Sequence, residues 1–229
     1  MSGMLIRYNT IPGGTQYGGT RISTFFKFST LPTIKTIFID CNSGATGYFR
    51  IYWDSTTNKV KSEAAYLGNT MSLDLTPSYT VSPNAWYWIS SMIGPAHPTI
   101  WEFWDMYSQI WGPGGVTAGT QLATLNLGQF GPVDVSSGVG WGVPLTAYNA
   151  FPNTAGNVMA ELCVERFTSG LINVRTPPAG PLSPGGSIEA LYHCNEALGS
   201  NRTLLDATTN HYDMAVGSQG NVVVLDSPF

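Results

Sequence analysis

Apolar and polar residues alternate along much of this chain, which is the pattern of half-buried β-strands. Residues 22–28 alternate in this way and stop at Leu31-Pro32. The segments 36–41 and 48–53 are separated by the turn residues Asn42-Ser43-Gly44-Ala45-Thr46-Gly47, so we predict a β-hairpin there. Further strands are predicted at residues 59–66, 85–93, 119–127, 139–143, 157–167 and 220–225.

Helical periodicity is weak throughout. A helix needs apolar residues at i, i+3, i+4 and i+7 over eleven or more positions, and glycine, proline or β-branched runs break the windows that come near this. The best short candidate is Trp101–Trp111. Closely spaced turn signals with no helices between them predict an all-β fold, a two-sheet antiparallel β-sandwich.

Composition agrees with this fold class and limits the function. Glycine and proline number 26 and 15, and only 10% of the 229 residues are charged, against roughly 25% in an average soluble protein. The polar surface must therefore be mainly Ser, Thr, Asn and Gln, which is typical of extracellular and virion β-proteins. With a net charge of −4 and ten scattered Lys and Arg residues, we expect no nucleic-acid partner. No apolar run approaches the roughly 20 residues needed to cross a bilayer, so we expect no membrane partner.

We expect one domain covering residues 1–229. The proline- and glycine-rich residues 176–186 are predicted to form a stiff, extended crossing. The remaining residues, 187–229, are too few to form an independent core, so we expect their strands to pack back onto the preceding part of the chain.

Several segments are similar to concanavalin A-like, laminin-G-like jelly-roll domains. They are Thr20–Phe28 with Thr36–Asp40, then Gly47–Asp54, Asn84–Ile89 and Gly156–Leu162. The C-terminal stretch Ala190–Glu196, with Asp206 and His211, resembles the first strand of that family although it comes last here. The resemblance implies a circularly permuted jelly roll of the kind found in phage virion proteins, or a C-terminal segment that completes a neighbouring subunit.

Because the family includes glucanases, the resemblance raises the question of a catalytic carboxylate pair. Retaining hydrolysis needs two carboxyl groups roughly 5 Å apart. Glu102 and Asp105 would point to opposite faces of a strand. Glu161 and Glu165 would share a face with Cys163, for which we expect an outward, polar surface rather than a catalytic pair. We therefore predict no catalytic residues and no enzymatic activity.

Metal and cofactor signals are also weak. His97, His193 and His211 lack ligand-spaced partners, and Cys41, Cys163 and Cys194 are expected to be buried free thiols. The spacing of these histidines and cysteines therefore predicts no metal site, and we expect no resident cofactor. The resemblance leaves calcium binding as an alternative, because many laminin-G-like domains bind calcium through loop aspartates. The aspartates expected beside loops are Asp40, Asp54, Asp74 and Asp206.

Aromatic residues are densest in residues 101–111. Aromatic rings with polar tips are common in protein and sugar interfaces, since they offer a large rigid surface. We take Trp101, Trp104, Tyr107 and Trp111 as the candidate interface or glycan-binding residues, the alternative being that these rings pack in the core.

These features lead to two main hypotheses. The first is a non-enzymatic virion structural protein, such as a capsid decoration, fibre or tail-associated protein, whose partners are other virion proteins or copies of itself. Residues 1–17 contain no apolar signal-peptide core, so we expect synthesis in a host cytoplasm and location in the virion. The alternative is an extracellular carbohydrate-binding, lectin-like module with a glycan partner. A glycoside hydrolase is less favoured.

Overall fold

The computed structural model describes residues 20–42, 47–66, 69–75, 80–95, 103–113, 115–116, 121–126, 139–141, 157–167, 173–193, 203–211, 213–215 and 228. Within these ranges the ordered elements are all β-strands, and the strand pairs are antiparallel. In this described part of the chain, no helix has the length and apolar character needed to span a membrane.

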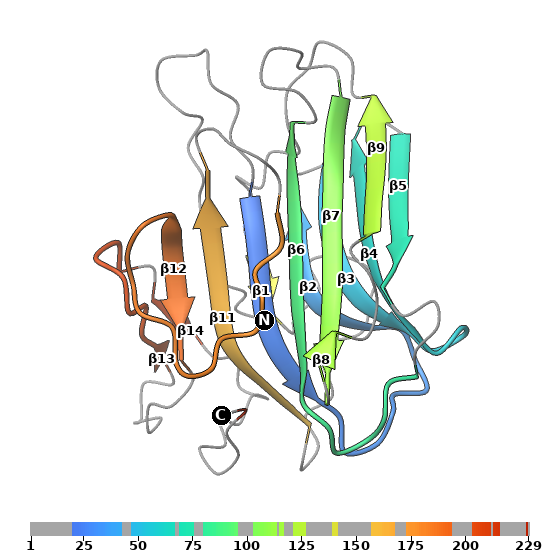
Figure 1. The fold of residues 1–229 in the computed structure, drawn as a ribbon, viewed down its shortest axis with the longest axis horizontal. Coiled ribbons are helices and arrows are strands. Elements are labelled where there is room, and N and C mark those ends of the chain that lie inside the picture. The colour runs from blue at the N-terminus through green and yellow to red at the C-terminus, as the bar shows by residue number, and fades with distance from the viewer. Residues whose placement is uncertain are drawn as a thin grey trace.

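The strands form two main sheets that lie face to face (Figure 1). The large sheet has the order β12-β11-β1-β6-β7-β8, and β9 also pairs with β7. Its strands are β12 (Ile188–Tyr192), β11 (Val158–Arg166), β1 (Thr20–Lys27), β6 (Tyr87–Pro95), β7 (Phe103–Gly112), β8 (Gly115–Val116) and β9 (Gln121–Asn126).

The small sheet lies behind the large sheet in Figure 1 and has the order β10-β2-β3-β4-β5. Its strands are β10 (Val139–Trp141), β2 (Thr36–Asn42), β3 (Gly47–Asp54), β4 (Lys59–Tyr66) and β5 (Asn69–Asp74). A separate short pair joins β13 (Thr203–Leu204) to β14 (Met214–Ala215). The predicted two-sheet antiparallel β-sandwich is therefore confirmed.

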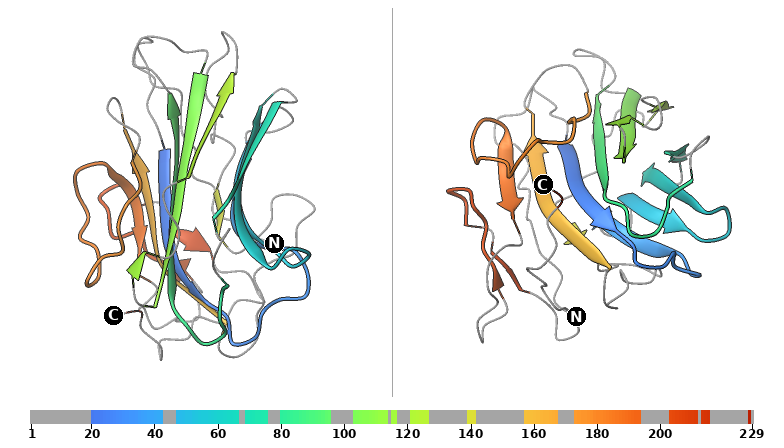
Figure 2. Two further views of the ribbon diagram at one scale, coloured as in Figure 1. Left: turned by 45° about the vertical axis from the view of Figure 1, so that its right-hand side comes forward. Right: turned by 60° about the horizontal axis from the view of Figure 1, so that its bottom comes forward.

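The two sheets face each other in the turned views (Figure 2), and the main core consists of buried side chains from both sheets. The Phe26 ring of the large sheet lies 4.5 Å from the Phe38 ring of the small sheet, centre to centre, and 5.3 Å from Tyr87. Phe28 contacts Trp53 across the same space, with ring centres 5.9 Å apart. Fully burying aromatic side chains of this size contributes roughly 1.5–3 kcal/mol each, so this cluster supplies much of the force that joins the sheets.

A second apolar cluster covers the opposite, outer face of the large sheet. It contains Phe25, Trp88, Trp111 and Ala160 from the strands, together with Val174 from the segment after β11. Because neighbouring residues in a strand point to opposite faces, Phe25 and Phe26 belong to different clusters. The large sheet thus carries apolar side chains on both faces, so another segment of the chain has to shield its outer face from water.

Most of the predicted strands are observed at or near the predicted residues, but some predictions differ from the structure. The short helix candidate at Trp101–Trp111 is wrong, because residues 103–112 form β7. The short strand β5 was not predicted, and the predicted strand at residues 220–225 lies outside the described residues.

Candidate functional site

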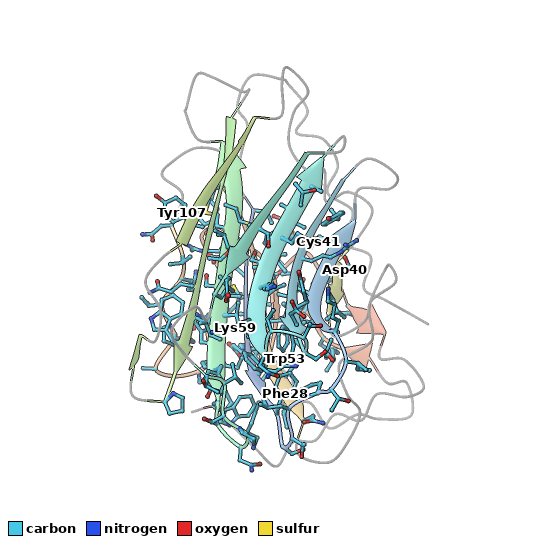
Figure 3. All side chains as sticks on the ribbon, turned by 90° about the vertical axis from the view of Figure 1, so that its right-hand side faces the viewer. Phe28, Asp40, Cys41, Trp53, Lys59 and Tyr107 are labelled. Atoms are coloured by element: carbon cyan, nitrogen blue, oxygen red, sulfur yellow. The ribbon has the colours of Figure 1, made fainter. Side chains whose placement is uncertain are left out.

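The aromatic segment enters the large sheet as part of β7. Tyr107 and Trp111 both lie on the outer face, four residues apart in the strand. Trp111 is only 5% exposed and packs in the outer cluster, whereas Tyr107 is partly buried at its edge. Figure 3 shows Tyr107 on the large-sheet side of the molecule, away from Asp40 and Cys41. Trp101 lies outside the described residues, and for Trp104 only the backbone position in β7 is described.

Residues 173–187, which we call the strap, run across the outer face of the large sheet. Figure 1 shows the strap as an orange segment in front of β11 and β1. The strap has no regular strand pairing, so side chains hold it in place. The indole Nε1 of Trp88 donates to the carbonyl of Arg175 at 2.7 Å, and the amide of Arg175 donates to Ser90 Oγ at 2.8 Å. These two bonds fix the strap backbone directly above β6.

The central anchor of the strap is the carboxylate of Glu165 in β11, whose side chain is fully buried. Arg21 of β1 donates from Nε and Nη2 to the two oxygens of Glu165, at 2.6 and 2.7 Å. Arg175 of the strap also donates from Nε and Nη2 to both oxygens, and the Nε bond is 2.9 Å long. Ser187 Oγ donates a further bond at 3.1 Å. One carboxylate therefore joins two strands of the sheet to both ends of the strap.

The electrostatic balance at Glu165 follows from these contacts. Burial by itself raises the pKa of Glu165, but the hydrogen bonds and charges of Arg175 and Arg21 outweigh it and lower the pKa to about 2. Glu165 is therefore ionised at any ordinary pH, with both oxygens occupied. Such a carboxylate is well suited to holding structure together and poorly suited to exchanging protons with a substrate.

A second carboxylate, Glu161, holds the middle of the strap. Glu161 lies at a β-bulge, where the pairing of β1 with β11 shifts by one residue, and its φ of 52° is rare for a residue with a side chain. Its Oε1 accepts the backbone amide of Leu182 at 2.6 Å. The Nδ1 of His193, just after β12, lies 2.9 Å from Oε2. The bulge therefore directs Glu161 toward the strap and toward the end of β12 together.

The expectation of an outward polar surface on β11 is wrong in one respect. Glu161, Cys163 and Glu165 do lie on the outer side of β11, but each is at most 1% exposed, because the strap covers them. Cys163 and Cys41 are buried free thiols, as predicted, while Cys194 lies outside the described residues. Burial, followed by the nearby Glu165 charge, raises the pKa of Cys163 to about 12, which leaves it unreactive as a nucleophile.

The small sheet carries its own charged group. Arg50 of β3 donates from Nε to Asp40 of β2 at 3.0 Å and stacks over the Tyr48 ring at 3.6 Å. The Tyr48 hydroxyl donates to Glu63 of β4 at 2.7 Å. Burial, then the hydrogen bond to Glu63 and its charge, raises the pKa of Tyr48 to about 12. This group joins three adjacent strands, and its charged members are already bonded to one another.

The aspartates considered for calcium have other partners. Asp40 binds Arg50, and Asp54 binds the ammonium of Lys61 at 2.7 Å. Asp206 accepts the amides of Leu191 and Thr208, while Asp74 pairs with Lys61 in the β4–β5 ladder through its backbone. Within the ranges that the structure describes, no three or more His, Cys, Asp or Glu side chains gather as a metal site would require.

The histidines and the remaining acidic candidates are scattered. His193 contacts Glu161, and His211 is exposed with a φ of 54°. His97 and Glu102 lie outside the described residues, and only the backbone of Asp105 is described. The residues that sequence reasoning overlooked are Arg21 and Arg175, although isolated arginines beside apolar strand residues in a chain so poor in charge are a recognisable signal of buried ion pairs.

Comparison with known proteins gives weak structural likenesses. No family model matches the sequence, and no curated protein matches it. The full-length tailspike protein 2 of Escherichia coli O157:H7 bacteriophage CAB120 has a TM-score of 0.40 and 16% identity, covering 66% of this chain and 20% of the tailspike. The Ruminococcus gnavus IT-sialidase CBM40 bound to alpha2,6 sialyllactose has a TM-score of 0.38 and 14% identity, covering 69% of this chain and 79% of the module.

These low TM-scores and identities limit what the two structures show about this chain. This chain spans about a fifth of the tailspike's length, so activities of that whole protein do not transfer to it. With TM-scores of 0.40 or less, neither likeness establishes a shared function. The function must be argued from this chain's own residues.

Proposed function

We propose that this chain is a non-enzymatic structural domain of a virus particle, working through contacts with other virion proteins or with copies of itself. The observation that carries the proposal is the use of Glu165 and Glu161, the two buried carboxylates on one face of β11. Both bind the chain's own strap and are at most 1% exposed. A catalytic acid or base needs a proton that it can exchange, and Glu165 with its pKa of about 2 is ionised at any ordinary pH.

The low charge of the chain also favours assembly with other proteins over a protein that works alone. Only 10% of the residues are charged, and the main charged groups of the described chain bind one another across strands. Burying a surface of Ser, Thr, Asn and Gln costs less free energy than burying a charged surface. The reason is that a hydrogen bond offsets the desolvation of a neutral polar group more fully than that of a charge. This favours the repeated protein contacts of a particle.

The test is localisation on particles together with a mass measurement. Antibodies raised against the purified full chain should label the particles of the virus that encodes it, and excess free chain should abolish the labelling. Light scattering should give a mass above that of one chain. A monomeric protein that is absent from purified particles would overturn the proposal.

We also propose that the domain is a circularly permuted, concanavalin A-like jelly roll covering the whole chain. Support comes from β12, which includes Ala190–Tyr192 of the family-like stretch and pairs with β11 although 21 residues separate the two strands. The side chains of Ala190 and Tyr192 are fully buried in the core between the sheets. The C-terminal part of the chain thus supplies core residues to the sandwich.

A second candidate function is carbohydrate binding. Trp86 and Tyr107 are partly buried and pack against the outer cluster, and the Lys27 ammonium lies 5.3 Å from the Trp86 ring centre. Aromatic rings that keep part of their surface exposed can stack on sugars. Glycan-array binding that Trp86→Ala and Tyr107→Ala abolish would support this function. Binding that is absent, or unaffected by both changes, would exclude it at these residues.

A further inference from the structure

The C-terminal part of the large sheet has the features of an exchangeable unit. β12 is the last strand in the order of the large sheet, and its described strand pairing is with β11. Its outer edge is closed by the segment that follows. The amide of Leu191 donates to Asp206 Oδ1 at 2.9 Å, and the carbonyl of Leu191 accepts the amide of Ala207 at 2.8 Å.

The carbonyl of Glu189 completes this closure. It accepts Thr208 Oγ1 at 3.2 Å and Asn210 Nδ2 at 2.8 Å. Exposed edges of sheets are sites where other chains add, and proteins commonly cover them. β12 and residues 204–210 therefore form one internally bonded unit, which we call the C-terminal unit, and it can move without breaking its own hydrogen bonds.

The sandwich cannot stay closed without a C-terminal unit. Ala190, Leu191 and Tyr192 are fully buried, and Leu204 is 3% exposed in the main core. Fully burying side chains the size of leucine contributes roughly 1.5–3 kcal/mol each. Losing the unit would expose the core side of β11, so a chain that releases its own unit has to accept one from another molecule.

A hinge lies directly before the unit. Gly185 has a φ of 136° and Gly186 a φ of 62°, values that residues with side chains rarely adopt. A Cβ added at either glycine would meet nothing within 4 Å, so their role is conformational rather than steric. One backbone bond, from the amide of Ile188 to the carbonyl of Gly185 at 3.2 Å, closes the turn. The strap before the hinge is independently fixed by Arg175 and Leu182.

We propose that two copies of this chain associate by exchanging their C-terminal units, with Gly185-Gly186 opening as the hinge. Each unit then forms the same β11–β12 pairing in the other copy, and Ser187 binds the other copy's Glu165. The described contacts within each sandwich are conserved, so among them the exchange breaks the turn bond between Ile188 and Gly185, and it also costs the entropy of association. This inference deepens the proposed function by naming a second copy as the partner, and it does not depend on the virus particle.

The decisive experiment uses the cysteine already present in β11. Cys163 lies directly opposite Leu191 in the β11–β12 ladder, and directly opposite residues are close enough for a disulfide. Because Cys163 is buried in the folded protein, the full chain carrying Leu191→Cys is unfolded, refolded at high protein concentration in a redox buffer and run on a non-reducing gel. We expect a covalent dimer that disappears when Cys163→Ser is added. A monomeric band whose new disulfide is mapped within one chain overturns the exchange.

A matched pair of hinge variants keeps the test valid if Leu191→Cys does not fold. Gly186→Val cannot hold a φ of 62° without strain, whereas Gly180→Val adds the same side chain to the strap where nothing lies within 4 Å. By light scattering, Gly186→Val should shift the chain toward dimer at least several-fold, and Gly180→Val should not. Equal dimer fractions for the two variants overturn the exchange. A dimer with only intramolecular disulfides would leave self-association, and so the proposed function, intact.

Discussion

Replacing Glu165 by glutamine tests the anchor of the strap most directly. Glutamine keeps the size of the side chain but removes the charge that both oxygens share with Arg21 and Arg175. It also places an NH₂ group against guanidinium donors. Removing one partner of a buried ion pair typically costs 3–5 kcal/mol. Because Arg21 and Arg175 keep 13% and 25% exposure, we expect a loss near the lower end, about 3 kcal/mol.

The lowered pKa of Glu165, which arises from the same contacts, corresponds to a similar magnitude. It falls from 4.5 to about 2 on folding, and each unit corresponds to 1.36 kcal/mol, which gives about 3 kcal/mol. A carboxyl group whose pKa is lowered by folding stabilises the protein above its unfolded pKa, and that contribution is lost as the pH falls through the folded value. The difference between wild type and Glu165→Gln should therefore be full at pH 7 and shrink between about pH 4.5 and pH 2.

Urea unfolding followed by tryptophan fluorescence measures this difference, since Trp88 and Trp111 lie in the cluster that the strap covers. Ser183→Ala is the control, because Ser183 lies in the same strap and its side chain is exposed. We expect the control to change the free energy of unfolding by less than about 1 kcal/mol. A Glu165→Gln variant as stable as the control, or a difference from wild type that does not shrink in acid, would refute the reasoning.

Three further predictions follow from the same contacts. Asp206→Ala leaves the buried amide of Leu191 without its partner and should cost about 1–3 kcal/mol in urea unfolding, an effect that Asp206→Asn should partly rescue. Cys163 and Cys41 should resist a thiol reagent at pH 8 until the protein unfolds, as peptide mapping by mass spectrometry would show, because burial raises both pKa values. A chain ending at Pro177 lacks β12 and should unfold at a lower temperature by calorimetry; equal heat resistance would contradict the single-domain prediction.

Some of the strands that sequence analysis located alternate apolar core residues with polar ones. In β3, for example, Phe49, Ile51 and Trp53 enter the core while Tyr48 lies on the opposite, partly exposed face. Such alternation is visible without a structure. β7 was harder to predict, because Met106 and Ile110 face the main core while Trp111 faces the outer cluster. A strand covered on both sides loses its two-residue period and resembles a short buried helix.

The strap explains why the candidate site was harder to predict than the fold. Glu161 and Glu165 alternate with Leu162 and Val164 as surface carboxylates would, and a segment later in the chain buries them. No local sequence pattern shows that a segment from elsewhere in the chain will bury these carboxylates. Arg175, directly before the proline-rich run, was the nearest clue, because a cation at the start of an extended crossing can bind a carboxylate beneath it.

The bulge at Glu161 allows β11 to lose one residue without changing which side chains face the core. Cys163 pairs with Ser23 and Ala160 with Phe25, so β11 carries one residue more than β1 over this interval. Deleting Glu161 would restore a regular ladder, with Met159 and Leu162 still on the core side and Ala160 still on the outer side. The deletion would remove the carboxylate that binds the amide of Leu182 in the strap. Related chains without a strap should therefore be able to lack this residue, whereas a deletion elsewhere in β11 would turn one half of the strand to the opposite face.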